Sequence, residues 1–183
     1  MKMKLLTAAA ALVACLGAWA EPITFKGFYA AMTADQFIAH AKSVGAINIQ
    51  DCRPKDEYGQ EVVTAEFSKC LEQLSGTTYC ITCAEASNLS LGGAKIETAS
   101  WIAEDTYQRV NLSPIAAHRV TLNEAIRLKF GPHDREEVIN RHDMVWTEYW
   151  WVQDLDNKMI LQDTASSVTL WKDLNAGADI DDF

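Results

Sequence analysis

The sequence predicts an α+β domain in which helices pack on one face of an antiparallel sheet, stapled by disulfides. Three observations carry this prediction: short capped helical segments, runs of strand-like segments after them, and four cysteines beyond the leader. Short helices followed by antiparallel strands favour such a layered arrangement, because each layer buries its apolar side on the other. We expect a signal peptide at 1–20, a single α+β domain at 21–175 and an acidic flexible tail at 176–183.

The leader has the pattern of a secretory signal. Lys2 and Lys4 precede a mainly apolar stretch, and small residues precede Glu21. The apolar stretch is shorter than the roughly 20 residues that a transmembrane helix needs. Charged residues interrupt every later apolar stretch, so we expect an exported chain with no transmembrane span.

Two processing signals compete within this leader. Ala18-Trp19-Ala20 resembles a signal-peptidase site, whereas the segment ending at Cys15 resembles a lipobox, in which the cysteine is lipidated. Leu16 follows Cys15, where a lipobox usually has a small or polar residue. We therefore expect cleavage after Ala20 and a free periplasmic or secreted protein. The alternative is a lipid anchor on Cys15, which is the one route to the membrane that the sequence offers.

The charge balance excludes some partners. The chain has a net charge of −9, and removal of residues 1–20 takes away two lysines and no acid, which moves the charge to −11. Nucleic acids select basic surfaces, and so do anionic lipids. We therefore expect no nucleic-acid partner.

The first helix is predicted from a capping box. Thr33 and Gln36 are spaced so that each side chain bonds the other's backbone N–H, and apolar residues then fall on one face as far as Gly45. This pattern predicts a helix over 34–44.

Thr121 and Glu124 repeat the capping pattern, and Gly131 ends this second helix. The two helical stretches resemble each other, although two short copies do not establish a repeat.

The remaining elements follow from apolar spacing. Approximate helical spacing predicts a middle helix over 62–74. Residues rich in β-branched and aromatic side chains predict the strands 77–84, 95–102, 107–112, 145–152, 158–162 and 168–172.

Four cysteines remain after the leader: Cys52, Cys70, Cys80 and Cys83. An even number in an exported chain favours two disulfides. Cys80 and Cys83 lie three apart on an expected strand, where they are poorly placed to bond each other. We therefore expect them to pair with Cys52 and Cys70, in either of the two arrangements.

Short motifs carry a resemblance to a known group. They are Met32–Gln36 with Gly45, Cys52 beyond them, and Thr121–Pro132. The chain resembles the fold shared by β-lactamase-inhibitor proteins and small outer-membrane assembly lipoproteins, and a broad group of bacterial periplasmic proteins. It departs from them in a cysteine-bearing insertion at 53–92 and in lacking a cysteine after the second helix. The resemblance implies a sheet face that is presented to a protein partner.

The segment VWTEYWW is the strongest candidate surface. Trp146 and Trp150 point to one side of an extended strand, and Tyr149 and Trp151 point to the other. The side with Trp146 and Trp150 is the more apolar, so we assign it to the core. We expect Tyr149 and Trp151 to be exposed at a partner-binding surface that Trp171 extends, because interfaces favour rigid aromatic side chains.

Two functions remain open. The first is a non-enzymatic module, without cofactor, that binds a protein partner in the bacterial envelope as an inhibitor, an immunity-type protein or an assembly factor. The alternative is an exported enzyme that uses His133, His142 and the acids Glu136 and Glu137 between them, with or without a metal ion. The spacing of these residues matches no established metal motif, so we expect neither a catalytic residue nor a metal ligand here.

Overall fold

A computed structural model describes residues 23–67, 71–74, 77–80, 89–141, 144–154, 156–162 and 167–175. For 71–74 and 77–80 only the backbone is described. The expected signal peptide, the lipidation site Cys15 and the acidic tail lie outside the described residues. Cys70, Cys83 and His142 lie outside them too.

Within the described residues the elements are two α-helices, one short 3₁₀ turn and eleven strands. The helical elements are α1 (Ala34–Ser43), η1 (Ala116–His118) and α2 (Arg119–Phe130). The strands are β1 (Asn48–Asp51), β2 (Glu61–Glu66), β3 (Leu71–Leu74), β4 (Thr77–Cys80), β5 (Ser90–Leu91), β6 (Ala94–Ala103), β7 (Tyr107–Pro114), β8 (Arg135–Arg141), β9 (Met144–Val152), β10 (Asn157–Gln162) and β11 (Val168–Asp173).

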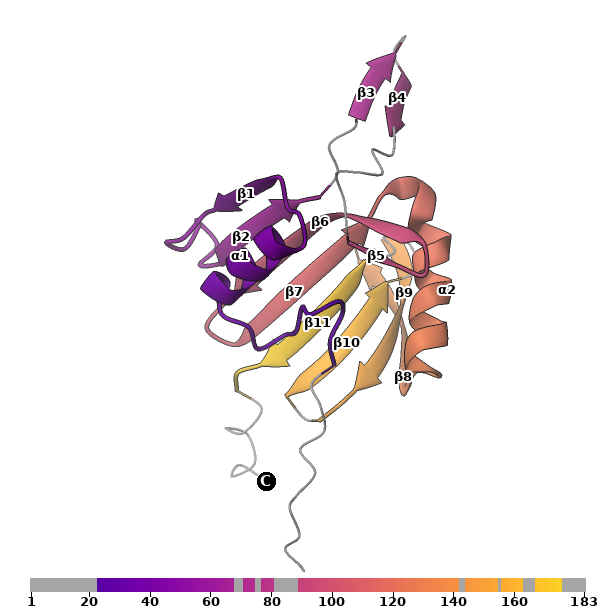
Figure 1. Cartoon of the computed structure of the whole chain (residues 1–183). Helices are drawn as coiled ribbons and strands as arrows, with labels where there is room; N and C mark the ends of the chain where they lie inside the picture. The colour runs from indigo at the N-terminus through magenta and orange to yellow at the C-terminus, as the bar shows by residue number, and fades with distance from the viewer. Residues whose placement is uncertain are drawn as a thin grey trace, which may run out of the picture.

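One antiparallel sheet of nine strands dominates the molecule (Figure 1). Its order is β1-β2-β6-β7-β11-β10-β9-β8, with β5 paired to β6, while β3 and β4 form a separate hairpin. The order divides into two halves that meet where β7 pairs with β11. In each half a helix is followed by a strand at the outer edge of the sheet, β1 after α1 and β8 after α2.

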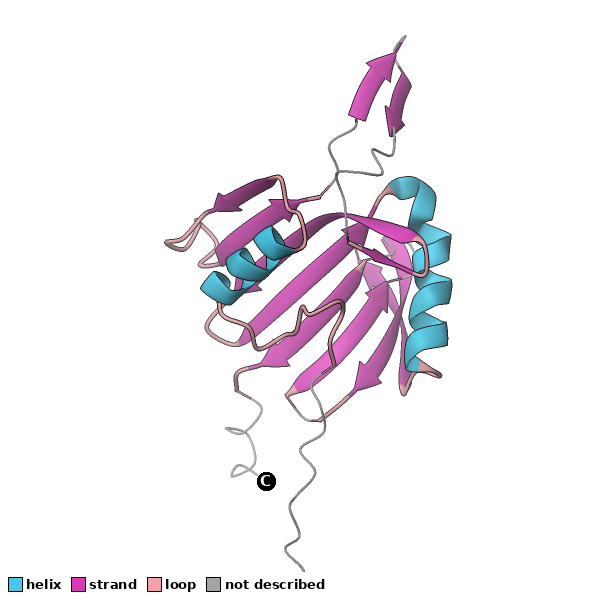
Figure 2. Ribbon diagram, viewed as in Figure 1, coloured by secondary structure: helices cyan, strands magenta, loops and turns pink. Residues whose placement is uncertain are grey.

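The predicted α+β class is wrong. Strands make up about half of the described residues, and the two α-helices have only 10 and 12 residues (Figure 2). The main cause is the middle of the chain, where the described residues of the range 62–74 form no helix. That range holds β2 and β3 instead. In β2 the buried side chains are Val63 and Ala65, followed by Phe67, which is the two-residue period of a strand.

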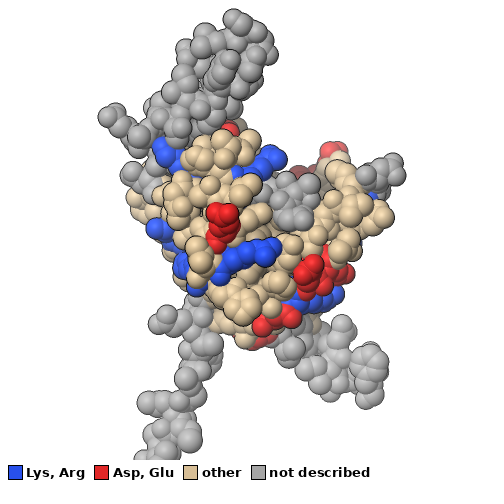
Figure 3. All heavy atoms as spheres, turned by 90° about the vertical axis from the view of Figure 1, so that its right-hand side faces the viewer, with Lys and Arg blue, Asp and Glu red and all other residues tan. Residues whose placement is uncertain are grey.

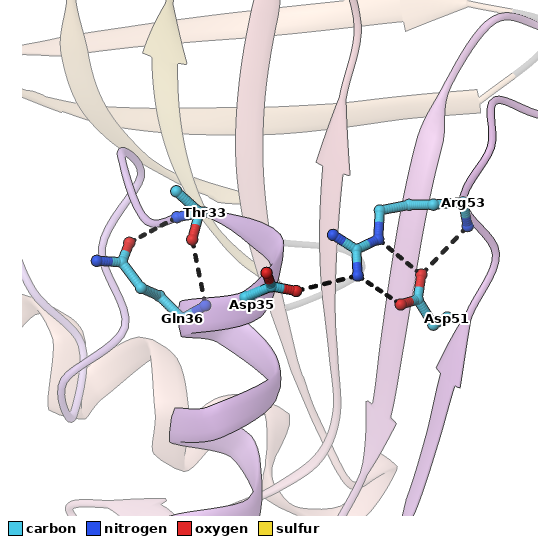
Figure 4. Close-up of polar contacts among 5 residues, drawn as sticks. All are labelled: Thr33, Asp35, Gln36, Asp51 and Arg53. Atoms are coloured by element: carbon cyan, nitrogen blue, oxygen red, sulfur yellow. Dashed lines mark hydrogen bonds and ion pairs between the residues drawn. The ribbon is translucent and has the colours of Figure 1, made fainter.

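The first helix is confirmed, with its capping box. Thr33 Oγ1 accepts from the N–H of Gln36, and the Gln36 side chain accepts from the N–H of Thr33 (Figure 4). The second helix ends at Gly131 as predicted, but its capping box is wrong. It begins one turn earlier, after His118, which makes no side-chain capping bond.

The core lies between the two helices and one face of the sheet, and both helices lie in front of the sheet in Figure 1. Phe37 and Ala41 of α1 and Leu122 and Ile126 of α2 are buried there. We call this side the helix face. The sheet contributes alternate residues to it, including Trp101, Val110, Leu112, Met159, Leu161 and Leu170.

The disulfide prediction is also contradicted. Cys52 follows the edge strand β1, is exposed and is unpaired. Its backbone N–H donates to the carbonyl of Val62 at 2.8 Å, which fixes the residue at the outer edge of the sheet. The structure contains no disulfide among the residues that it describes.

Candidate functional site

The other face of the sheet, which we call the open face, is covered by none of the described helices (Figure 1). It is hollowed over β7 to β11 and encloses a volume of about 510 Å³. The side chains that line this hollow include four aromatic residues, Tyr107, Trp146, Trp150 and Trp171, and three basic ones, Arg109, Arg141 and Lys158. The others are Glu137, Glu148, Ile139, Ile160, Gln162 and Thr169.

The strand register explains why these side chains gather. Residues directly opposite each other in an antiparallel pair point to the same face. Trp150 is opposite Ile160, and Ile160 is opposite Thr169. Two residues further along the strands is a second row, in which Lys158 is opposite Trp171 and Trp171 is opposite Arg109. These two rows form the floor of the hollow.

Cations lie over the aromatic rings of this floor. The Lys158 ammonium is 4.8 Å from the ring centroid of Trp150 and 5.4 Å from that of Trp171. The Arg135 guanidinium lies 4.9 Å from the centroid of the Trp150 ring. Because an aromatic face attracts a cation, these contacts hold the Lys158 side chain between two indoles.

The charges at the two ends of the hollow differ. Arg109 and Lys158 share one row with Trp171, whereas Glu148 lies two rows away, opposite Gln162. Glu148 Oε1 accepts from Trp146 Nε1 and from Gln162 Nε2, both at 3.0 Å. Within the described residues, no ion pair within 4.0 Å involves Arg109, Lys158 or Glu148. We call the row of Arg109 and Lys158 the basic end of the hollow and the row of Glu148 its acidic end. The third basic residue, Arg141, lies on β8 opposite Met144, beyond Glu148, and forms no ion pair among the described residues.

The basic end and the adjoining row of Trp150 also carry buried N–H groups that have no acceptor among the described residues. These are Nε of Arg109, Nε1 of Trp150 and Nε1 of Trp171. Burial, together with the hydrogen bond that Tyr107 donates to Glu104, raises the pKa of the Tyr107 hydroxyl above its ordinary value. The Tyr107 hydroxyl therefore keeps the proton that it donates to Glu104. The donors without an acceptor are those of Arg109, Trp150 and Trp171.

The predicted faces of β9 are reversed in the structure. Trp151 is only 5% exposed and belongs to the core, and Tyr149 packs against that core. The reason is α2, which covers this side of the strand. Trp151 Nε1 donates to the carbonyl of Gly131 at 3.2 Å, and the Arg127 guanidinium lies 4.3 Å from the Tyr149 ring centroid.

Trp171 lies on the open face, in the hollow, and so it shares no face with Tyr149 and Trp151. Sequence reasoning missed Trp150, Arg109 and Lys158 as members of the same surface. A signal for Arg109 was present, because polar residues alternate with buried Val110 and Leu112 in β7. In β10 the run Met159-Ile160-Leu161 is apolar throughout and gives no such signal for Lys158.

Of the two histidines in the alternative enzyme hypothesis, His133 lies on the helix face, and His142 lies outside the described residues. His133 Nε2 is 3.5 Å from a Glu136 oxygen, and its ring contacts those of Tyr149 and Trp151. Glu137 points to the open face instead, where it pairs with Arg135 at 2.6 Å. The structure thus separates the two acids that the sequence places side by side. In the described part of the chain, no three His, Cys, Asp or Glu residues are grouped as metal ligands.

Charged side chains are scattered over the α2 side of the molecule, with wide uncharged areas between them (Figure 3). None of the helices in the described ranges is both long and apolar enough to cross a bilayer. Comparison of the chain with protein-family models, with curated proteins and with solved structures gives no match in any of the three.

Proposed function

We propose that this chain is a non-enzymatic binding module of the bacterial envelope that recognises a protein partner through the open face of its sheet. The observation that supports the proposal most is the hollow, where three tryptophans and a tyrosine lie together with Arg109 and Lys158. Trp, Tyr and Arg are the residue types that dominate the binding energy of protein interfaces.

The setting of these side chains favours binding as well. They project from paired strands, so the backbone that carries them is fixed before a partner arrives. Cation contacts and the stacking of Trp171 on Tyr107 restrain their rotamers. A pre-ordered surface loses less conformational entropy on binding than a mobile one.

The location rests on the leader. The secretory pattern of residues 1–20 supports export, and cleavage after Ala20 would release the module into the periplasm or the medium. The enzyme hypothesis gains no support from the described contacts of His133. Those contacts are packing on two aromatic rings and a single acid, while the Asp134 carboxylate accepts from the N–H of Val152 at 2.8 Å.

Site-specific photo-crosslinking in the envelope of the native host tests the proposal. A benzophenone amino acid replaces Gln162, which lines the hollow, and in a matched control it replaces Leu128, which is 87% exposed on α2. We expect one defined protein adduct from position 162 and none from position 128. Adding Trp150→Ala should abolish the adduct while the protein stays folded.

Equal adducts from both positions would contradict the proposal. So would an adduct at position 162 that persists in the folded Trp150→Ala protein.

A further inference from the structure

The two ends of the hollow differ in charge, and that difference specifies the kind of partner segment that fits. Arg109 and Lys158 lie in one row of the sheet, and Glu148 lies in the row of Gln162. Lys158 and Gln162 are four residues apart on β10, which at about 3.3 Å per residue separates the two rows by about 13 Å. The floor between them consists of Trp150, Ile160 and Thr169.

Resting on the function proposed above, we infer that the hollow binds an extended segment of the partner that carries a carboxylate and, four residues away, a lysine or arginine. The carboxylate lies between Arg109 and Lys158. The cation lies at Glu148. In an extended segment, residues four apart point to the same side and are separated by the same distance as the two rows.

The contacts of Lys158 support a carboxylate of the partner at the basic end of the hollow. Lys158 is held between the rings of Trp150 and Trp171 and has no carboxylate within 4.0 Å among the described residues. A cation that is partly removed from water in this way gains more from a carboxylate than an exposed lysine does. The unpaired N–H groups of Arg109, Trp150 and Trp171 add to the excess of donors at this end.

The acidic end of the hollow favours a cation of the partner. Glu148 is fixed by N–H donors from Trp146 and Gln162, neither of which neutralises its charge. The neighbouring acid on β8, Glu137, is already paired with Arg135. Arg141, the cation of the hollow on this side, lies on β8 opposite Met144 and is not within 4.0 Å of a Glu148 oxygen. Glu148 is therefore the carboxylate of the hollow without an ion pair, and an incoming lysine or arginine supplies one.

Synthetic nine-residue peptides without tryptophan test the inference, with the tryptophan fluorescence of the purified protein as readout. The first peptide has Asp at position 3 and Lys at position 7, with Ser, Thr and Val elsewhere. A second moves Lys to position 6, which turns it to the opposite side, and a third has Lys at both 3 and 7. We expect the first to bind about fivefold more tightly than either control, the factor expected for an ion pair worth about 1 kcal/mol.

Charge variants of the protein make the test specific. Lys158→Glu should reverse the preference, so that the Lys/Lys peptide binds more tightly than the Asp/Lys peptide. Lys158→Gln should abolish the preference for Asp, and Glu148→Gln should abolish the preference for Lys at position 7. Circular dichroism and thermal unfolding identify any variant that fails to fold, and the remaining variants then decide the result.

Equal binding of the peptides with Lys at positions 6 and 7 would overturn the inference, as would absence of binding by all three. Inorganic phosphate that displaces the Asp/Lys peptide, with no effect of spacing, would show a simple anion site instead. If the peptides fail but the crosslink from position 162 still depends on Trp150, the inference alone falls. If that crosslink fails, the proposed function falls with it.

Discussion

The indole ring of Trp171 stacks on the phenol ring of Tyr107, with the ring centroids 4.4 Å apart and the ring planes inclined by 22°. The two residues belong to β11 and β7, the strands that join the two halves of the sheet. The stack therefore lies at the centre of the sheet order, at the basic end of the hollow.

This contact predicts an energetic coupling between the two rings. Aromatic pairs in contact contribute about 0.5–1.5 kcal/mol beyond the area that they bury. A double-mutant cycle with Tyr107→Leu and Trp171→Leu, measured by urea denaturation, should give a coupling in that range. A cycle of Trp171→Leu with Leu128→Ala is the control and should be additive, because Leu128 is exposed on α2, on the helix face. Additive effects in the first cycle would contradict the stacked arrangement.

Adjacent tryptophans on β9 should differ in their cost to stability. Trp151 is 5% exposed and bonds the carbonyl of Gly131, whereas Trp150 lies in the hollow. Truncating a buried tryptophan costs about 3–5 kcal/mol. We expect Trp151→Ala to reduce the free energy of unfolding by that amount and Trp150→Ala to reduce it by clearly less. A larger loss for Trp150→Ala in chemical denaturation would place the core on the other side of β9.

Strand β9 also shows a feature that could not be predicted from the sequence, namely which of its two sides faces the core. Aromatic residues occupy both sides of β9, so alternation within the strand does not tell which side faces the core. Hydropathy favoured Trp146 and Trp150, but the structure places α2 over Tyr149 and Trp151. That choice depends on the register between β9 and β10, in which Trp151 is opposite Met159. A register is a long-range property that one segment does not contain.

The elements that could be predicted are those specified by their own residues. Thr33 and Gln36 define the start of α1, and Gly131 defines the end of α2. By contrast, β8 is an exposed edge strand in which Val138 and Ile139 are adjacent, so it shows no clean alternation. It is a strand because it pairs with β9, and it is absent from the strands that the sequence predicts.

The turn between β5 and β6 should tolerate a methyl group at one glycine and not at the other. A Cβ added to Gly92, where φ is +55°, would lie 2.6 Å from the Cβ of Ala125 in α2. A Cβ on Gly93, where φ is +87°, would meet nothing within 4 Å. Both substitutions carry the strain of a positive φ, so Gly93→Ala controls for it.

Forcing an extra methyl group into a packed contact costs about 1–3 kcal/mol. We expect Gly92→Ala to lower the free energy of unfolding, and Ala125→Gly to recover part of that loss in the double variant. Thermal unfolding of the three variants and of Gly93→Ala measures both effects. Strict additivity of Gly92→Ala and Ala125→Gly would show that the turn does not pack on α2.

Arg53 links the beginning of α1 to the end of β1 through two carboxylates (Figure 4). Its guanidinium lies 3.1 Å from an Asp35 oxygen and 2.6 Å from an Asp51 oxygen. The hydrogen bonds from Arg53 hold the pKa of Asp51 below its ordinary value of 3.8, and the hydrogen bonds to Asp51 and Asp35 raise the pKa of Arg53.

These shifts predict an acid-sensitive contribution to stability. A carboxyl group whose pKa is lower in the folded than in the unfolded state stabilises the fold above the unfolded value, and this contribution is lost as the pH falls through the folded value. We therefore expect the difference in unfolding free energy between wild type and Asp51→Asn to be constant between about pH 5 and pH 7 and to shrink below about pH 4. Because the pair is exposed, about 1 M salt should reduce the difference at every pH. Urea denaturation across this pH range measures it, and a difference that grows on acidification would show that Arg53 does not hold Asp51 in its charged form.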